Sequence, residues 1–203
     1  MNFGFLLNPE GGQVPSVFDP SRANRIQSRV FCDPARSRDS GPPQLTATGR
    51  LQAAAIARVL RSLSIERLIT SPYVRALETA RIIAAELELP ITVEPLVAER
   101  FCFTCDIGSP LAELRTRWPD LVFDHLPDPW WPQLEETEAQ ISQRSVSFRR
   151  LIGSEAWSKI AVITHWGFIR ALTGLKIRNG AVLRIDPTRL DQEPEIILIP
   201  DAA

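Results

Sequence analysis

The sequence predicts an α/β fold, a three-layer α/β/α sandwich with a mostly parallel central sheet, in one domain over residues 1–203. Short apolar runs alternate with longer amphipathic runs, as in chains whose helices cover a parallel sheet. The run Ala161-Val162-Ile163 is apolar throughout, which a strand covered on both faces requires. A chain of 203 residues, 44% of them hydrophobic, can also bury a sizeable core.

The chain begins with a predicted strand at residues 3–7. Residues 8–44 follow as an irregular loop, because prolines and glycines interrupt any period, and loops of this length often have a functional role. A helix is expected at 47–62. Its predicted inner face consists of residues that recur with a helical period, namely Leu51, Ala55 and Val59, with Ile56 and Leu60 beside them.

The next strand is expected at 66–70 and the next helix at 73–88. Pro72 suits the first turn of that helix, where its missing N–H is not needed. A third strand is expected at 91–94. These elements continue the alternation that a parallel sheet requires.

An insertion at 100–134 is expected to form a lid over the functional site. Inside it, Ser109 as cap and Pro110 after it predict a helix at 109–118. The aromatic segment 126–132 is rigid, and Trp130 in it either packs the insertion against the body or lines a pocket.

The rest of the chain repeats the alternation. A helix is expected at 135–152, a strand at 159–164 and a helix at 167–174. Two strands, at 181–185 and 195–199, complete the sheet.

One of the two histidines stands where the strand at 159–164 ends. The segment Thr164-His165-Trp166-Gly167 leads from this strand into the next helix. An imidazole is therefore expected at the carboxyl end of a strand, where open α/β sheets hold ligands. A histidine that only caps the helix or fills the core is the alternative.

A second signal is Arg75, in the first turn of the helix at 73–88. A cation near the positive end of a helix is unfavourable, which suggests that an anion lies nearby. An ordinary solvated arginine is the alternative.

With these motifs the chain resembles the histidine phosphatase superfamily, the phosphoglycerate-mutase-like proteins. The family pattern L-T-x-x-G-x-x-Q-A is matched from Leu45 to Ala53. The pattern S-S-P-x-x-R-A-x-x-T-A is matched from Ser71 to Ala80, with Thr70 for the first serine. The pattern S-H-x-G-x-I-R is matched from Thr164 to Arg170, with threonine for serine. The resemblance implies the phosphoglycerate-mutase-like fold.

The chain departs from this family at its nucleophile. The family has an Arg-His-Gly motif just after the first strand, whereas this chain has Asn8-Pro9-Glu10 and no histidine before His125. In the family, that histidine attacks phosphorus while arginines clamp the phosphoryl oxygens and an acid protonates the leaving group. Loss of a covalent nucleophile can lower turnover on the order of a millionfold. Substrate positioning alone leaves a rate about 10³–10⁴ times that of the reaction in water. We therefore expect no efficient phosphatase activity.

The resemblance implies that part of the site is retained. Glu99 aligns with a glutamate that precedes Cys-Asp-x-Gly in one bacterial and plant branch. His165 and Glu99 are the expected catalytic pair, because a histidine and a glutamate with separated pKa values can act as acid and base. Arg75, His165 and Asn8 are the expected anion ligands.

Three further residues are expected to line the pocket: Trp166, Arg25 and Trp130. Trp166 occupies a position where the family commonly has a small residue, so it would narrow the pocket and favour an aromatic or apolar ligand. Arg25, in the loop at 8–44, would replace the missing arginine clamp.

Composition excludes several classes. A net charge of −1 gives no global field for nucleic acid. No apolar run approaches the ~20 residues of a membrane span, and there is no basic start before an apolar stretch. The cysteines Cys102 and Cys105 lack the remaining ligands of a zinc site, so neither metal nor cofactor is expected. We expect a cytoplasmic protein with a small anionic metabolite as ligand; its oligomeric state stays open, a homodimer included.

Three interpretations of function remain open. The fold has been recruited for acid–base chemistry, such as a lyase, dehydratase, isomerase or cyclase step. Alternatively, the chain is a non-catalytic ligand-binding or scaffold pseudoenzyme. In the third interpretation a weak phosphomonoesterase persists, with His165 or a water molecule as nucleophile.

Overall fold

The computed structural model describes residues 3–7, 44–153, 159–187, 189 and 193–198. Asn8, Arg25 and the predicted loop, apart from its last residue, lie outside the described residues.

The fold is built on a six-stranded sheet with the order β3-β2-β4-β1-β5-β6. Pairing is parallel from β3 through β1, while β5 and β6 are antiparallel to their neighbours. The predicted α/β fold with a mostly parallel sheet is therefore confirmed. The strands are β1 Phe3–Leu7, β2 Arg67–Thr70, β3 Ile91–Val93, β4 Lys159–Ile163, β5 Val182–Ile185 and β6 Glu195–Leu198.

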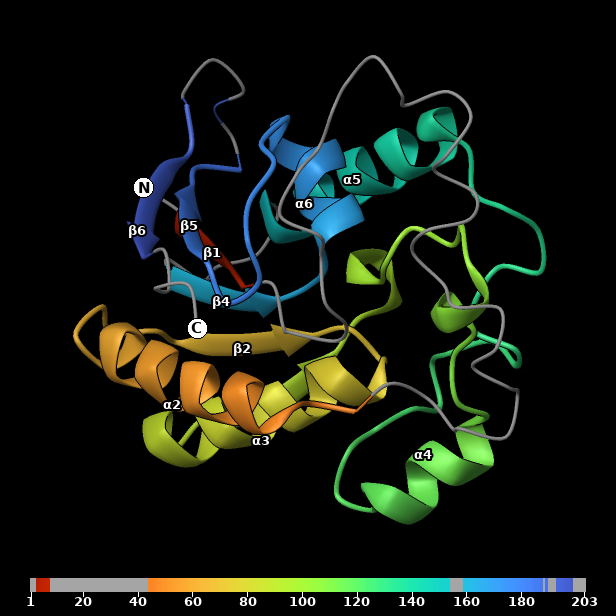
Figure 1. Ribbon diagram of the computed structural model, residues 1–203, viewed down its shortest axis with the longest axis horizontal. Coiled ribbons are helices and arrows are strands. Elements are labelled where there is room, and N and C mark those ends of the chain that lie inside the picture. Colours follow the sequence, from red (N-terminus) through yellow and green to blue (C-terminus); the bar gives the residue numbers. More distant parts are fainter. Residues whose placement is uncertain (1–2, 8–43, 154–158, 188, 190–192, 199–203) are drawn as a thin grey trace.

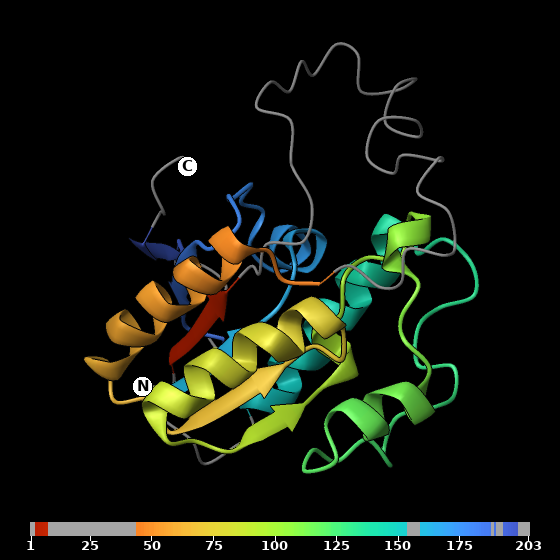
Figure 2. The same cartoon turned by 60° about the horizontal axis from the view of Figure 1, so that its bottom comes forward.

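Helices cover both faces of the sheet (Figure 1). α2 and α3 lie on one face, α5 and α6 lie on the other, and α4 lies beside these layers (Figure 2). The helices are α2 Ala47–Arg61, α3 Val74–Leu87, α4 Leu111–Arg117, α5 Glu138–Gly153 and α6 Trp166–Thr173. Short 3-10 turns occur at η3 Pro95–Val97 and η4 Thr104–Asp106.

The central strand β4 supplies residues to both hydrophobic cores. Ala161 and Ile163 pack in the cluster that includes α2 and α3. Ile160 and Val162 pack in the cluster that includes α5 and α6. This alternation is why the strand is apolar from Ile160 to Ile163.

The predicted inner face of α2 is wrong for Leu51, Ala55 and Val59, which are exposed or half-buried, whereas the flanking Ile56 and Leu60 are buried. Leu51 is 74% exposed, and the buried stripe is rotated around the helix. Its members recur at helical spacing and include two small residues that permit close packing against α3: Ala53, Ile56, Ala57 and Leu60. The sequence contains two apolar stripes on this helix, and packing against α3 determines which of them is buried.

Two predicted helix starts are also displaced. Tyr73 is the N-cap of α3, so Pro72 precedes the helix. Pro110 is the N-cap of α4, and the Ser109 hydroxyl instead donates to a carboxylate oxygen of Glu113 at 3.2 Å. Ser109 lies one residue before the N-cap, because α4 begins at Leu111.

The insertion is joined to the body by apolar packing. Its buried apolar residues belong to the same cluster as α2 and α3; they are Leu111, Leu114, Trp118, Phe123, Leu126 and Trp130. Among the described helices, none is long and apolar enough to cross a membrane.

The order of the strands determines which residues meet at the site. β2 and β4 are parallel neighbours, with Thr70 opposite Ile163. The residues that follow each strand therefore emerge at the same edge of the sheet, and the Ser71 N–H donates to the Ile163 carbonyl at 3.0 Å. β1 ends at this edge as well, because Leu7 also lies opposite Ile163.

Candidate functional site

A buried histidine and a buried serine are in direct contact at this edge. His165 is the N-cap of α6 and is 1% exposed, and Ser71 is 0% exposed. The Nε2 atom of His165 lies 2.8 Å from the Oγ atom of Ser71. The Tyr73 N–H donates to the same Oγ at 3.4 Å. Because this N–H uses an acceptor position of Oγ, the serine proton can point toward Nε2.

His165 is held neutral by its surroundings. Burial lowers its pKa well below the usual range, and the positive charges of Arg75 and Arg144 lower the pKa further. A neutral imidazole whose Nε2 lacks a proton can accept one from Ser71.

Glu99 faces the amino-terminal end of α6. Its Oε1 atom accepts the Gly167 N–H at 2.9 Å and the Arg100 N–H at 2.8 Å. A Cβ atom on Gly167 would lie 2.5 Å from Oε1, so glycine permits this close approach. Burial raises the Glu99 pKa to about 7; the negative charge of Asp106 also raises it and Arg75 lowers it. The carboxyl can therefore act as an acid or a base near neutral pH.

Arg75 lies beside the same group of residues. Its Cζ atom is 4.6 Å from the centroid of the Tyr73 ring. The His165 ring centroid is 5.1 Å from that of Tyr73, so arginine and histidine both contact one tyrosine. The Arg75 residue is 7% exposed, and within the described part of the chain no carboxylate forms a salt bridge with it. A buried cation without a paired anion is costly, which is the condition of an anion-binding site.

The structure thus brings Arg75, His165 and Glu99 together from three separate segments. It also adds residues that the sequence did not single out, with Ser71 and Tyr73 in the matched motif after β2. The Tyr73 hydroxyl donates to the Asp106 carbonyl, and the Asp106 carboxylate accepts the Cys102 and Phe103 N–H groups, at 3.2 and 3.0 Å.

Arg144 is the other residue that sequence patterns did not indicate. From α5, its guanidinium donates to the carbonyls of Leu96 at 2.8 Å, Ala98 at 2.7 Å and Glu99 at 3.3 Å. It also holds the Glu136 carboxylate at 2.6 and 2.8 Å. Since these partners are mostly backbone oxygens, no spacing of side chains in the sequence could have revealed them.

The two tryptophans named in the sequence have different surroundings. Trp130 is 6% exposed, donates from Nε1 to the Ser109 carbonyl at 2.9 Å and meets the Tyr73 ring edge-on at 4.8 Å. Trp166 is 36% exposed, and its ring contacts the Arg170 guanidinium at 5.5 Å. Trp130 is therefore a packing residue, and among the described residues its ring contacts the site at Tyr73.

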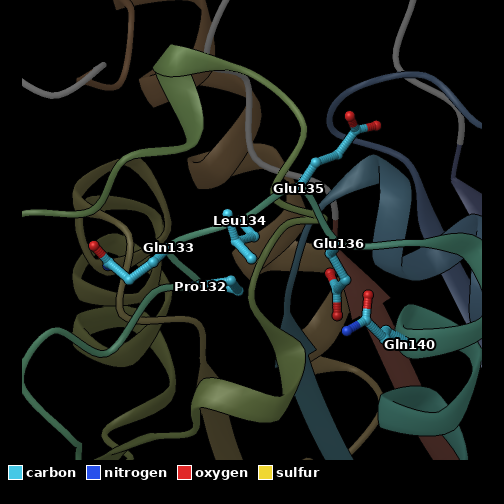
Figure 3. Close-up of a pocket in the computed structure, with 6 residues that line it drawn as sticks. All are labelled: Pro132, Gln133, Leu134, Glu135, Glu136 and Gln140. Carbon is cyan, nitrogen blue, oxygen red and sulfur yellow. The ribbon is translucent and has the colours of Figure 1, made fainter.

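A cavity of about 310 Å³ lies elsewhere, at the end of the insertion (Figure 3). Its lining is formed by Pro132, Gln133, Leu134, Glu135, Glu136 and Gln140. In Figure 3 the Glu136 carboxylate faces Gln140, while Glu135 points away from both. No predicted site residue lines this cavity.

Within the described residues, no three His, Cys, Asp or Glu side chains gather where they could share a metal ion. Cys102 and Cys105 are free thiols, and burial raises the pKa of Cys102 to about 11. A thiol with that pKa is protonated at neutral pH and is a poor metal ligand or nucleophile.

Comparisons with known proteins agree with the fold. The model of the histidine phosphatase superfamily (branch 1) matches residues 35–190. A Bacillus subtilis protein named "Uncharacterized phosphatase PhoE" is 29% identical over 146 residues, which make up 72% of this chain and 70% of that protein. An uncharacterized protein of Mycobacterium tuberculosis is 32% identical over 155 residues, 72% of each chain. The solved structure of Bacillus stearothermophilus YhfR has the same fold, with a TM-score of 0.62 at 18% identity over 100% of this chain and 98% of that one.

Proposed function

We propose that this chain, which belongs to branch 1 of the histidine phosphatase superfamily, binds a phosphate monoester at Arg75, His165 and Glu99 and hydrolyses it slowly, without a phosphohistidine. The observation that carries this proposal is the buried Arg75, which has no carboxylate partner among the described residues and lies beside a neutral histidine and a carboxyl with a pKa of about 7.

The charge of the site suits a phosphoryl group. Arg75 can bind two phosphoryl oxygens with its planar guanidinium. His165 adds a neutral hydrogen-bonding group at the same place. Glu99 is partly protonated near pH 7, so it can remain beside a dianion and can protonate a leaving alkoxide. The site therefore has an anion clamp and a general acid.

The proposed rate is low because the family nucleophile is missing. Asn8-Pro9-Glu10 follow β1 where the family has Arg-His-Gly, and the family match begins only at residue 35. Asn8 lies outside the described residues, so its expected part in anion binding stays a proposal. The relative named as a phosphatase supports phosphate chemistry over the other interpretations.

A second candidate is acid–base chemistry on a carboxylated metabolite. The neighbouring His165 and Glu99 favour it, because one is neutral and the other titrates near pH 7. The same anion clamp would then hold a carboxylate.

Hydrolysis of p-nitrophenyl phosphate tests the proposal. We expect slow turnover, about 10³–10⁴ times faster than the uncatalysed reaction in water. Inorganic phosphate should inhibit it. Arg75→Ala should lower the rate at least about tenfold, because a guanidinium stabilises phosphoryl charge. The matched control is Arg81→Ala on the same helix, whose exposed pair with Asp120 lies on the surface. Equal activity of wild type and Arg75→Ala, or no phosphate binding at all, would contradict the proposal. Phosphate binding without hydrolysis would favour the second candidate or a non-catalytic binding role.

A further inference from the structure

We propose that Ser71 is the nucleophile of this site and His165 its general base, so that hydrolysis passes through a phosphoserine. This inference rests on the proposed phosphomonoesterase function and identifies the group that would replace the family histidine. It differs from the expectation that His165 or a water molecule attacks phosphorus.

The contact between the two side chains is that of an activated hydroxyl. The Oγ and Nε2 atoms are 2.8 Å apart, within the range in which a base takes the proton of a nucleophile. The Tyr73 N–H on Oγ leaves the hydroxyl proton free for Nε2. If His165 itself attacked, its Nε2 would first have to give up this hydrogen bond.

Binding of an anionic substrate would make His165 more basic, as its role as a general base requires. The low pKa in the free protein arises from burial and from Arg75 and Arg144. A phosphoryl dianion bound at Arg75 would offset that positive field and raise the basicity of His165 when substrate is present. Among the described residues, the acidic groups near the site are Glu99 and Asp106, whose pKa values are both raised mainly by burial.

The first step forms the Oγ–P bond and breaks the bond from phosphorus to the leaving oxygen. The proton of Ser71 moves to Nε2 of His165, and protonated Glu99 gives its proton to the leaving alkoxide. In the second step a water oxygen attacks phosphorus while ionised Glu99 takes its proton. The Oγ–P bond then breaks and His165 returns the proton to Ser71, which restores the starting state without an external co-reactant.

A purely structural role would also explain the contact, because a buried imidazole needs a hydrogen-bond partner. Both side chains are buried, so substrate entry requires that the site opens. The two roles differ in one chemical product: only a nucleophile becomes covalently phosphorylated. The test therefore measures covalent phosphorylation of the protein.

Wild type and Glu99→Gln are incubated with p-nitrophenyl phosphate, quenched in parallel in acid and in neutral denaturant, and mapped by peptide mass spectrometry. Nitrophenolate leaves without protonation, so Glu99→Gln should still form the adduct and should lose the base for its hydrolysis. We expect an acid-stable phosphate on Ser71, several-fold more abundant in Glu99→Gln. Ser71→Ala should lose the adduct and at least about tenfold of the hydrolysis, while Ser147→Ala, which alters a half-buried serine of α5 whose hydroxyl donates to the Gln143 carbonyl, should change neither.

Ser71→Cys, of similar size, checks that the alanine variant has not simply unfolded, and thermal melting is compared for all variants. An acid-labile phosphate on His165 would overturn the proposal, as would hydrolysis that persists in folded Ser71→Ala. If wild type neither hydrolyses the ester nor binds phosphate, the proposed function fails and this inference fails with it. Hydrolysis that is sensitive to Arg75→Ala and insensitive to Ser71→Ala would overturn the nucleophile alone.

Discussion

At the scale of single residues, the site depends on a carboxyl that is held partly protonated. Burial raises the Glu99 pKa from 4.5 to about 7, although two N–H groups donate to it. Two hydrogen bonds therefore do not offset the loss of water around the charge. A carboxyl whose pKa is strongly raised by burial is typical of functional sites.

Glu99→Gln should therefore stabilise the protein above pH 7. The folded state binds the Glu99 proton more tightly than the unfolded state, so the carboxyl contributes stability below pH 4.5 that is lost as the pH rises through about 7. Glutamine keeps an oxygen for the Gly167 N–H and has no charge to desolvate. We expect a gain of roughly 1–3 kcal/mol in unfolding free energy above pH 7 and little gain below pH 4.5.

Urea unfolding at several pH values measures this difference. Glu135→Gln is the matched control, because that side chain is 71% exposed and should leave the curve unchanged. Parallel pH–stability curves for wild type and Glu99→Gln would mean that the Glu99 carboxyl ionises normally.

At the scale of elements, Arg144 ties α5 to the segment that carries Glu99. Its guanidinium joins three carbonyls of residues 96–99 to the buried Glu136 carboxylate. Its Cζ atom also lies 5.4 Å from the Phe168 ring centroid in α6. One side chain thus contacts both elements that hold the Glu99 carboxyl in place.

Arg144→Met should be strongly destabilising, by about 3–5 kcal/mol, because it leaves the Glu136 charge buried without its partner. Arg144→Lys keeps a charge but cannot reproduce the planar fork, so an intermediate loss is expected. Arg81→Met serves as control, since its exposed pair with Asp120 contributes about 0–1 kcal/mol. Denaturant unfolding measures the unfolding free energy of each variant. Similar losses of this free energy in Arg81→Met and Arg144→Met would refute the structural role given to Arg144.

At the scale of the whole molecule, the sequence predicted what depends on local pattern. The six strands of the described residues were predicted close to their observed bounds because each contains a short group of apolar residues. The stripe of α2 was mispredicted, since Leu51 and Ala53 are both apolar and only packing against α3 selects one. Local pattern thus determined the elements, and packing determined their buried faces.

The candidate site shows the same limit. Arg75, His165 and Glu99 could be found from the resemblance, whereas the contact of Ser71 with His165 depends on β2 lying next to β4. Strand order joins residues 94 positions apart, and no periodicity in the sequence encodes it. Arg144 was missed because its partners are chiefly carbonyl oxygens.

The position of β1 allows a direct test of the proposal that the family nucleophile is absent. β1 lies beside β4 and ends with Leu7 opposite Ile163, two residues before His165. The family has Arg-His-Gly just after its first strand, and residues 8–10, which lie outside the described residues, follow β1 here. The triple change Asn8→Arg, Pro9→His and Glu10→Gly should therefore bring an imidazole to the edge of the sheet that carries His165.

We expect this triple variant to hydrolyse p-nitrophenyl phosphate at least about tenfold faster than wild type, because a covalent nucleophile is added to the proposed anion site. The trapped phosphate should become acid-labile, as a phosphohistidine is, and should persist when Ser71→Ala is added. Asn8→Arg alone is the control, since it adds the charge without the nucleophile. The contrary outcome is a folded triple variant that binds phosphate and yet gains neither rate nor acid-labile adduct. That result would show that the end of β1 does not lie over the site. It would contradict the proposal that this site is equivalent to the active site of the family.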